Sequence, residues 1–290
     1  QRDHDHSHTG QRDHDHSHTR QRRPFSGREP SERMKILLTN DDGIDAVGIR
    51  TLYDRLSAVA DVTVVAPTED QSSVGRQLSR TVELTEHEMG YAVEGTPSDC
   101  VVATLGSLDF DPDMVVSGIN QGANLGAYVL GRSGTVSAAV EATFFDVPAI
   151  AASVYFPAGE FTFEDFSATP EHFEEAARAV EYLVEHAPNV DVFETADYLN
   201  VNAPVSASDG DASMEITRPS HVYRMDADSN GDGTIRIHDR IWELMAEGSV
   251  PDPVGSDRRA VLEGRVSVSP LTAPHTTTDH EALSGLAEAY

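Results

Sequence analysis

Short apolar runs alternate with amphipathic stretches along the chain after Met34. Four of these runs have the β-branched or small apolar residues typical of parallel strands covered on both faces. They span residues 35–39, 62–66, 113–117 and 149–153. Helical periodicity separates or follows them at 47–60, 97–105, 135–145 and 171–186, and a fifth strand is expected at 198–202. The alternation predicts a three-layer, doubly wound, Rossmann-like α/β fold with a mostly parallel sheet.

The pattern changes after about residue 205, where polar and apolar residues alternate as in exposed antiparallel strands. The alternating segments are 214–218, 234–239 and 261–269. We expect them to form a C-terminal antiparallel hairpin arm. Within this region Asp226, Asp228, Asn230 and Gly231 resemble the start of a calcium-binding EF-hand loop. Ile237 occupies the position that requires a bidentate Glu, so we interpret the segment as a hairpin turn.

The first 33 residues differ in composition from the rest. QRDHDHSHT occurs at 1–9 and again at 11–19, and Phe25 is the only large apolar side chain of the segment. Such a segment has no core to bury, so we expect a disordered His/Asp-rich tail. Its histidines could bind a transition metal loosely, but we favour a solvated tail preceding a true start at Met34. We expect one folded domain at 34–290, with its core at about 34–205 and the arm and C-terminal segment at about 206–290.

Composition and charge exclude several classes of partner. No stretch reaches the roughly 18 apolar residues of a membrane helix, and the first thirty residues contain no apolar block, so we expect a soluble cytoplasmic protein. The net charge of −28 argues against nucleic acid and membrane surfaces as partners. Cys100 is the only cysteine, which excludes an internal disulfide framework and a Cys-based zinc site.

The kinds of charged residue in the chain indicate the salt concentration of its environment. Lys35 is the only lysine, so an acidic surface is combined with basic residues that are otherwise all arginine. Repulsion across such a surface is screened in molar salt, where the Debye length falls to about 3 Å. We therefore favour a halophilic source over an ordinary acidic protein from a GC-rich genome.

Polar residues follow three of the predicted strands at their carboxyl ends, where open parallel sheets bind ligands. Asp41 and Asp42 follow the first strand, and Gly43 allows the turn that both carboxylates need to face one site. Ser72 lies in the loop after the second strand, and Asn120 and Asn124 follow the third. Taken singly, each has a structural alternative, a helix cap for the acids and the serine or a glycine-rich turn for the asparagines.

A helix start completes this set of groups. Ser133, Gly134 and Thr135 open a predicted helix whose free N–H groups and dipole suit a phosphate, although Ser and Thr also serve there as caps. Oxygen ligands without His or Cys favour a hard divalent cation such as Mg²⁺ or Mn²⁺. Such a cation can lower the pKa of a bound water and stabilise charge on a phosphoryl group.

These motifs resemble those of the SurE family of survival-protein nucleotidases. The matching segments are MKILLTNDDGIDAVGI at 34–49, VVAPTEDQSSVG at 64–75, GTPSDCV at 95–101, VSGINQGANLG at 116–126, SGTVSAAVEA at 133–142 and LNVNAP at 199–204. The resemblance covers about residues 34–270. It implies one divalent cation per subunit, Mg²⁺ or Mn²⁺, held by Asp41, Asp42, Ser72 and Asn120. It further implies a catalytic phosphate site lined by Asn124, Ser133, Gly134 and Thr135.

The resemblance also implies an activity and an assembly. Family members hydrolyse nucleoside 5′- and 3′-monophosphates, here expected to proceed through a metal-activated water, and they form homodimers or homotetramers through the C-terminal arm. Gln71 stands where members commonly carry a basic residue, and Gly131-Arg132 stands where many carry Tyr or His, which bears on substrate preference. Two alternatives are a phosphatase for polyphosphate or another small phosphate ester, and a non-catalytic nucleotide-binding module. An inactive relative should have lost an oxygen ligand, and none of the four is missing.

Overall fold

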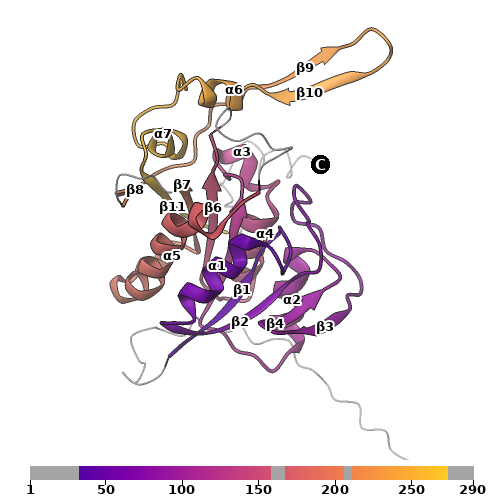
Figure 1. The fold of residues 1–290 in the computed structure, drawn as a ribbon, viewed down its shortest axis with the longest axis vertical. Helices are drawn as coiled ribbons and strands as arrows, with labels where there is room; N and C mark the ends of the chain where they lie inside the picture. Colours follow the sequence, from indigo (N-terminus) through magenta and orange to yellow (C-terminus); the bar gives the residue numbers. More distant parts are fainter. Residues whose placement is uncertain (1–32, 158–166, 206–210, 274–290) are drawn as a thin grey trace, which may run out of the picture.

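The computed structural model describes residues 33–157, 167–205 and 211–273. Five parallel strands occupy the middle of its main sheet, in the order β2 (Ala60–Pro67), β1 (Met34–Thr39), β5 (Met114–Gln121), β6 (Ala149–Tyr155) and β7 (Tyr198–Pro204). Each matches a strand that the apolar pattern predicts. The α/β fold with a mostly parallel sheet is therefore confirmed (Figure 1).

At both edges the sheet extends beyond the five strands predicted for its centre. At one edge, β4 (Gly90–Val93) runs parallel to β2, and β3 (Leu84–His87) runs antiparallel to β4. At the other edge, β11 (Val266–Leu271) runs antiparallel to β7, and β8 (Met214–Ile216) runs parallel to β11. The described main sheet has nine strands in the order β3-β4-β2-β1-β5-β6-β7-β11-β8. The β3 strand carries no sequence signal because its side chains lie mostly in solvent.

Helices cover both faces of the sheet, as a doubly wound fold requires. The covering helices are α1 (Val47–Leu56), α2 (Pro97–Ser107), α4 (Gly134–Phe144) and α5 (Glu174–His186). Ile36 and Leu38 of β1 belong to the apolar core shared with α1 and α5. Leu37, between them, belongs to the core shared with α2 and α4. Alternate side chains of one strand thus enter two cores, which explains the uninterrupted apolar run.

Local signals place some helix ends correctly and miss others. Thr96 is the N-cap of α2 as predicted, since its Oγ1 accepts the N–H of Asp99 at 3.1 Å and Asp99 accepts the N–H of Thr96 at 2.9 Å. The helix predicted at 47–60 is too long, because α1 ends at Leu56. Ala60 instead pairs with Met34 in the sheet and is buried. Strand pairing there outweighs the helical periodicity.

The C-terminal prediction is right for one hairpin and wrong for its surroundings. β9 (Met225–Ser229) and β10 (Ile235–Asp239) form an antiparallel hairpin that projects from the body of the molecule (Figure 1). Of the residues that resemble a calcium loop, Asn230 and Gly231 lie in the hairpin turn as expected, whereas Asp226 and Asp228 lie in β9 and pair with β10. The segments at 214–218 and 261–269 do not belong to the arm, because β8 and β11 extend the main sheet and α7 (Asp257–Leu262) precedes β11. The apolar positions of β11, Val266 and Val268, are buried in the core.

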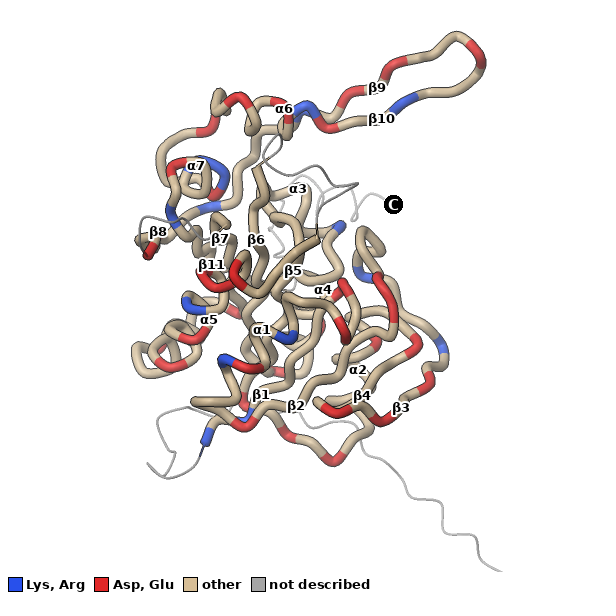
Figure 2. The backbone as a smooth tube through the Cα atoms, viewed as in Figure 1, with Lys and Arg blue, Asp and Glu red and all other residues tan. Residues whose placement is uncertain are grey.

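Short elements complete the described chain. They are α3 (Ala127–Leu130), η2 (Pro170–Phe173), η3 (Ala187–Val190), η4 (Val192–Glu194) and α6 (Ile241–Ala246). Acidic residues are spread over the sheet edges, the helices and the hairpin, whereas basic residues are few and scattered (Figure 2). In the described part of the chain, none of the helices has the length and hydropathy needed to span a bilayer. The tail predicted at 1–33 lies outside the described residues, except for Arg33.

Candidate metal and phosphate site

Asp41 and Asp42 lie on a tight turn directly after β1. The side-chain amide of Asn40 donates to the carbonyl oxygen of Gly43 at 2.8 Å and closes this turn. Gly43 has a φ of +98°, which favours glycine and lets the chain leave the strand at once. The two adjacent carboxylates are therefore not forced to opposite faces of the sheet.

Asp41 is held at the N-terminus of α4. Its Oδ1 accepts the hydroxyl hydrogen of Thr135 at 2.6 Å, and it also accepts the backbone N–H of Thr135. A Cβ on Gly134 would lie 2.9 Å from Oδ2 of Asp41, so only glycine allows this approach. Ser133 caps α4, since its Oγ accepts the N–H of Val136 at 3.1 Å. The structure thus brings Asp41 together with the predicted Ser133-Gly134-Thr135 segment.

Asp42 connects the same turn to the end of β5. Its Oδ2 accepts the backbone N–H of Gln121 at 2.9 Å, and Gln121 directly follows Asn120. The side-chain amide nitrogen of Asn120 donates to the carbonyl oxygen of Gly122, which leaves its Oδ1 as the oxygen that could bind a cation. Asp42 and Asn120 therefore meet at the carboxyl edge of two adjacent strands.

Ser72 reaches this edge on the loop after β2. The backbone N–H of Gln71 donates to the carbonyl oxygen of Asp41 at 2.7 Å, which attaches the loop beside the Asp41-Asp42 turn. Ser72 itself donates its hydroxyl hydrogen to Oδ1 of Asp70 at 2.6 Å. Sequence reasoning did not single out Asp70. The available signal was a carboxylate two residues before a serine in a loop at a strand's carboxyl end.

The GTPSDCV segment holds the continuation of this loop. Thr96 donates its hydroxyl hydrogen to the carbonyl oxygen of Gln77 at 2.7 Å, and Asp99 accepts the N–H of Ser79 at 2.7 Å. Both residues are buried at the start of α2. This motif therefore anchors the Ser72 loop and adds no ligand to the site.

Electrostatics favour a cation between the two carboxylates. Burial raises the pKa of Asp41, against the opposing hydrogen bonds from Thr135. Burial raises the pKa of Asp42 to about 7, and repulsion from Asp41 adds to this rise. In the described part of the chain, the ion pairs involve neither residue. A buried and a partly buried acid side by side fit a bound divalent cation, which would offset their charge.

The composition of the donor set also decides the kind of metal. Within the described ranges there is no group of three or more His, Cys, Asp and Glu side chains with the geometry of a metal site. The candidate ligands are instead two carboxylates, a hydroxyl and an amide oxygen. This donor set suits Mg²⁺ or Mn²⁺ and does not suit a soft or thiolate-bound metal.

Asn124 lies in a buried polar network below this edge. Its side-chain amide nitrogen donates to Oγ of Ser153 at 2.9 Å, and its backbone N–H donates to Oδ1 of Asn202 at 2.8 Å. Its carbonyl oxygen accepts the side-chain amides of Asn200 and Asn202 at 3.0 and 3.1 Å. Sequence reasoning missed these partners, although asparagines at alternate positions of a buried strand were visible in LNVNAP. The role of Asn124 in phosphate binding stays a prediction.

Residues in the C-terminal part of the chain form hydrogen bonds to the loop that follows Asn124. The carboxylate of Asp257 accepts the N–H groups of Gly126 at 2.6 Å and Ser220 at 2.9 Å. Arg258, fully buried, donates to the carbonyl oxygens of Leu125 and Val222 at 3.4 and 3.0 Å. The C-terminal part is thus built into the neighbourhood of the candidate site.

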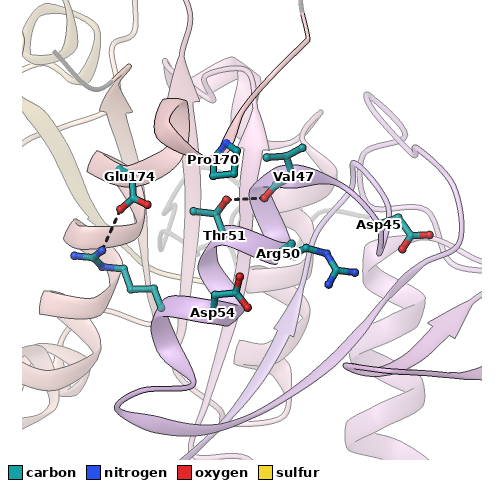
Figure 3. Close-up of a pocket in the computed structure, with 8 residues that line it drawn as sticks. Asp45, Val47, Arg50, Thr51, Asp54, Pro170 and Glu174 are labelled. Carbon is teal, nitrogen blue, oxygen red and sulfur yellow. Dashed lines mark hydrogen bonds and ion pairs between the residues drawn. The ribbon is translucent and has the colours of Figure 1, made fainter. Parts of the chain in front are cut away.

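A separate pocket of about 450 Å³ lies on the outer side of α1, between α1 and the η2–α5 segment (Figure 3). It is lined by Asp45, Val47, Arg50, Thr51, Asp54, Arg55, Pro170 and Glu174. Arg50 is ion-paired with Glu88 at 2.7 Å, and Arg55 is ion-paired with Glu174 at 3.1 Å. Its two arginines are already neutralised, and none of the predicted site residues lines it.

Comparison with known proteins identifies the family of the chain. The family profile described as Survival protein SurE matches residues 36–226. The 5′-nucleotidase SurE of Natronomonas pharaonis is 71% identical over 257 residues, which cover 89% of this chain and the whole of that protein. The 5′-nucleotidase SurE of Haloarcula marismortui is 64% identical over 88% of this chain and 94% of that protein.

A solved structure has a similar fold. The SurE protein from Aquifex aeolicus superimposes with a TM-score of 0.70 at 32% identity, covering 84% of this chain and 95% of that one. The curated relatives just named come from halophilic archaea, as the acidic composition predicts. The sequence and fold comparisons agree, and the chain belongs to the SurE family.

Proposed function

We propose that this protein is a divalent-metal-dependent phosphatase that hydrolyses nucleoside 5′- and 3′-monophosphates to nucleoside and phosphate. The activity is supported by relatives named 5′-nucleotidase SurE that align over most of the chain. The observation that carries the metal-dependent chemistry is the pair of adjacent carboxylates after β1: buried Asp41, bonded to Thr135 at the N-terminus of α4, and partly buried Asp42, bonded to the N–H of Gln121 in β5.

Four residues from three strand ends would hold the cation, namely Asp41, Asp42, Ser72 and Asn120. A bound Mg²⁺ or Mn²⁺ supplies an acidified water and offsets negative charge on the phosphoryl oxygens. The protein's own contribution is orientation. Thr135 fixes one oxygen of Asp41, and the N–H of Gln121 fixes one oxygen of Asp42, so neither carboxylate has to reorganise when a ligand binds.

The phosphate group of the substrate is proposed to bind beside the start of α4. N–H groups at a helix N-terminus and the positive end of its dipole attract an anion. Gly134 lets Asp41 approach this terminus, so the cation ligands and the phosphate-binding groups share one small volume. Asn124 is held by Ser153 and Asn202, which makes it a rigid part of the neighbouring loop.

A phosphate-release assay tests the proposal. The purified protein is incubated in molar KCl with Mn²⁺ or Mg²⁺ and a panel containing 5′- and 3′-nucleoside monophosphates, tripolyphosphate and a sugar phosphate. We expect release from the nucleotides and its loss in excess EDTA. Full activity in EDTA, with no metal retained by mass spectrometry, would contradict the metal requirement. Preference for tripolyphosphate or the sugar phosphate would replace the nucleotide assignment.

We also propose a homodimer or homotetramer formed through the C-terminal arm. Ile235 and Ile237 of β10 support this, because they are 65% and 70% exposed on a projecting hairpin. Light scattering coupled to gel filtration measures the oligomeric state, and a variant with both isoleucines replaced by Thr is the comparison.

We further propose that residues 34–290 form a single domain. We also propose that the protein is cytoplasmic, and its lysine-poor, acidic composition supports this location.

A further inference from the structure

The hydroxyl of Ser72 donates its single hydrogen to a neighbouring carboxylate. It donates to Oδ1 of Asp70 at 2.6 Å, and the same oxygen accepts the backbone N–H of Ser72 at 2.8 Å. A serine hydroxyl has one hydrogen and two lone pairs, and only the lone pairs can bind a cation. With the hydrogen directed to Asp70, the lone pairs of Ser72 are left for another partner.

We propose that Asp70 is a positioning residue of the cation site, acting through the hydroxyl of Ser72. The inference rests on the proposed function, because it assumes that Ser72 binds the cation. Carboxylates that accept a hydrogen bond from a metal ligand fix that ligand's orientation and increase its basicity. Asp70 would do this for a hydroxyl, which without such a partner can rotate its hydrogen toward the metal.

The backbone places Asp70 at the site independently of its side chain. A Cβ on Gly43 would lie 3.6 Å from the backbone nitrogen of Asp70, so this residue packs against the Asp41-Asp42 turn. The next residue, Gln71, donates its N–H to the carbonyl oxygen of Asp41. The negative charge of Asp70 also raises the pKa of both Asp41 and Asp42. Its carboxylate is therefore within electrostatic reach of both proposed ligands.

Two roles for this third carboxylate can be distinguished. As a direct ligand, it would form a three-carboxylate metal cluster with Asp41 and Asp42, and no such cluster occurs among the residues that the structure describes. As a partner of Ser72, it needs only the hydrogen bond that is present. The geometry favours the second role, in which Asp70 orients the hydroxyl of Ser72 without occupying a coordination position.

Calorimetric titration of the whole protein with Mn²⁺ in molar KCl tests the positioning role of Asp70 without any turnover. We expect Asp70→Ala to weaken Mn²⁺ binding by about 10- to 100-fold. Asp70→Asn should weaken it less, because the amide oxygen still accepts the hydroxyl hydrogen but carries no charge. The matched control is Glu69→Gln, an equal loss of charge at the exposed neighbouring residue, which should bind Mn²⁺ like the wild type.

A double-mutant cycle with Ser72→Ala separates an effect through Ser72 from a general charge effect. We expect Asp70→Ala to cost little further affinity once Ser72 is alanine. Fully additive losses would overturn the inference, as would wild-type affinity in Asp70→Ala or an equal loss in Glu69→Gln. Melting curves of the metal-free variants confirm that each is folded. A wild-type protein that binds no Mn²⁺ would overturn the metal-site proposal and this inference together, whereas the other outcomes concern Asp70 alone.

Discussion

Gly126 and Arg258, distant in sequence, approach so closely that no side chain fits between them. A Cβ on Gly126 would lie 2.1 Å from a guanidinium nitrogen of Arg258. Gly126 has a φ of +90°, and its N–H is bound by the carboxylate of Asp257. The loop that follows Asn120 and Asn124 is thus fixed by a buried arginine and its acidic neighbour.

Replacing Arg258 should strongly destabilise the protein. Arg258, Asp252 and Asp257 are all buried, so Arg258→Met leaves buried carboxylates without their cation. We expect a loss of about 3–5 kcal/mol in the free energy of unfolding. The matched control is Arg259→Met, which removes a half-exposed pair with Glu263 and should cost about 0–1 kcal/mol. Denaturant titrations at one KCl concentration measure both, and equal losses would show that the buried arginine has no special role.

Asp42→Asn should abolish turnover while leaving the fold intact. The variant keeps the size of the side chain but removes a charged ligand, so we expect phosphate release below about a hundredth of the wild-type rate. Asp45→Asn, the same change at an exposed acid three residues later, should retain activity. Wild-type turnover in Asp42→Asn would place the cation elsewhere.

The raised pKa of Asp42 predicts that the stability of the metal-free protein depends on pH. Burial raises the pKa of Asp42 to about 7, above its ordinary value of 3.8. Its contribution to stability is therefore full below pH 4 and is lost as the pH rises through about 7. In EDTA, the melting temperature of Asp42→Asn should gain on the wild type between pH 5 and pH 8. Parallel melting curves across this range would show that Asp42 does not titrate there.

Stability and activity should rise together with salt. The chain carries a net charge of −28, and its carboxylates repel across a Debye length of about 30 Å at 0.01 M ionic strength. Added Mn²⁺ should partly rescue the low-salt protein by binding its folded state. Thermal melts and rates across a KCl series measure this. A protein equally stable and active in dilute buffer would refute the halophilic adaptation and leave the phosphatase assignment intact.

Cys100 should not react while the protein is folded. The thiol is completely buried in the core between the sheet and α2, and burial raises its pKa well above its ordinary value. Both access and thiolate formation are therefore suppressed. A chromogenic disulfide reagent should label one thiol per chain in denaturant and none in the native protein. Rapid native labelling would mean that α2 opens readily.

Local patterns in the sequence determined the central fold. Apolar runs such as 35–39 marked strands because both faces of these strands are buried, and Thr96 marked a helix start because its cap is formed by residues only three positions apart. The candidate site could also be predicted from the sequence, because several motifs with characteristic spacing follow the carboxyl ends of strands, and these ends share one edge of a parallel sheet.

Tertiary structure alone decided the rest, because the deciding contacts join distant residues. The alternation at 261–269 predicts an arm strand with exposed polar positions, but β11 pairs beside β7, where Ser267 and Ser269 are as buried as Val266 and Val268. The contact of Asp41 with Thr135, the network around Asn124 and the position of Asp70 beside Gly43 all depend on strand order and loop packing. Residue type and spacing thus supplied the candidate ligands, whereas the three-dimensional packing decided which groups orient them.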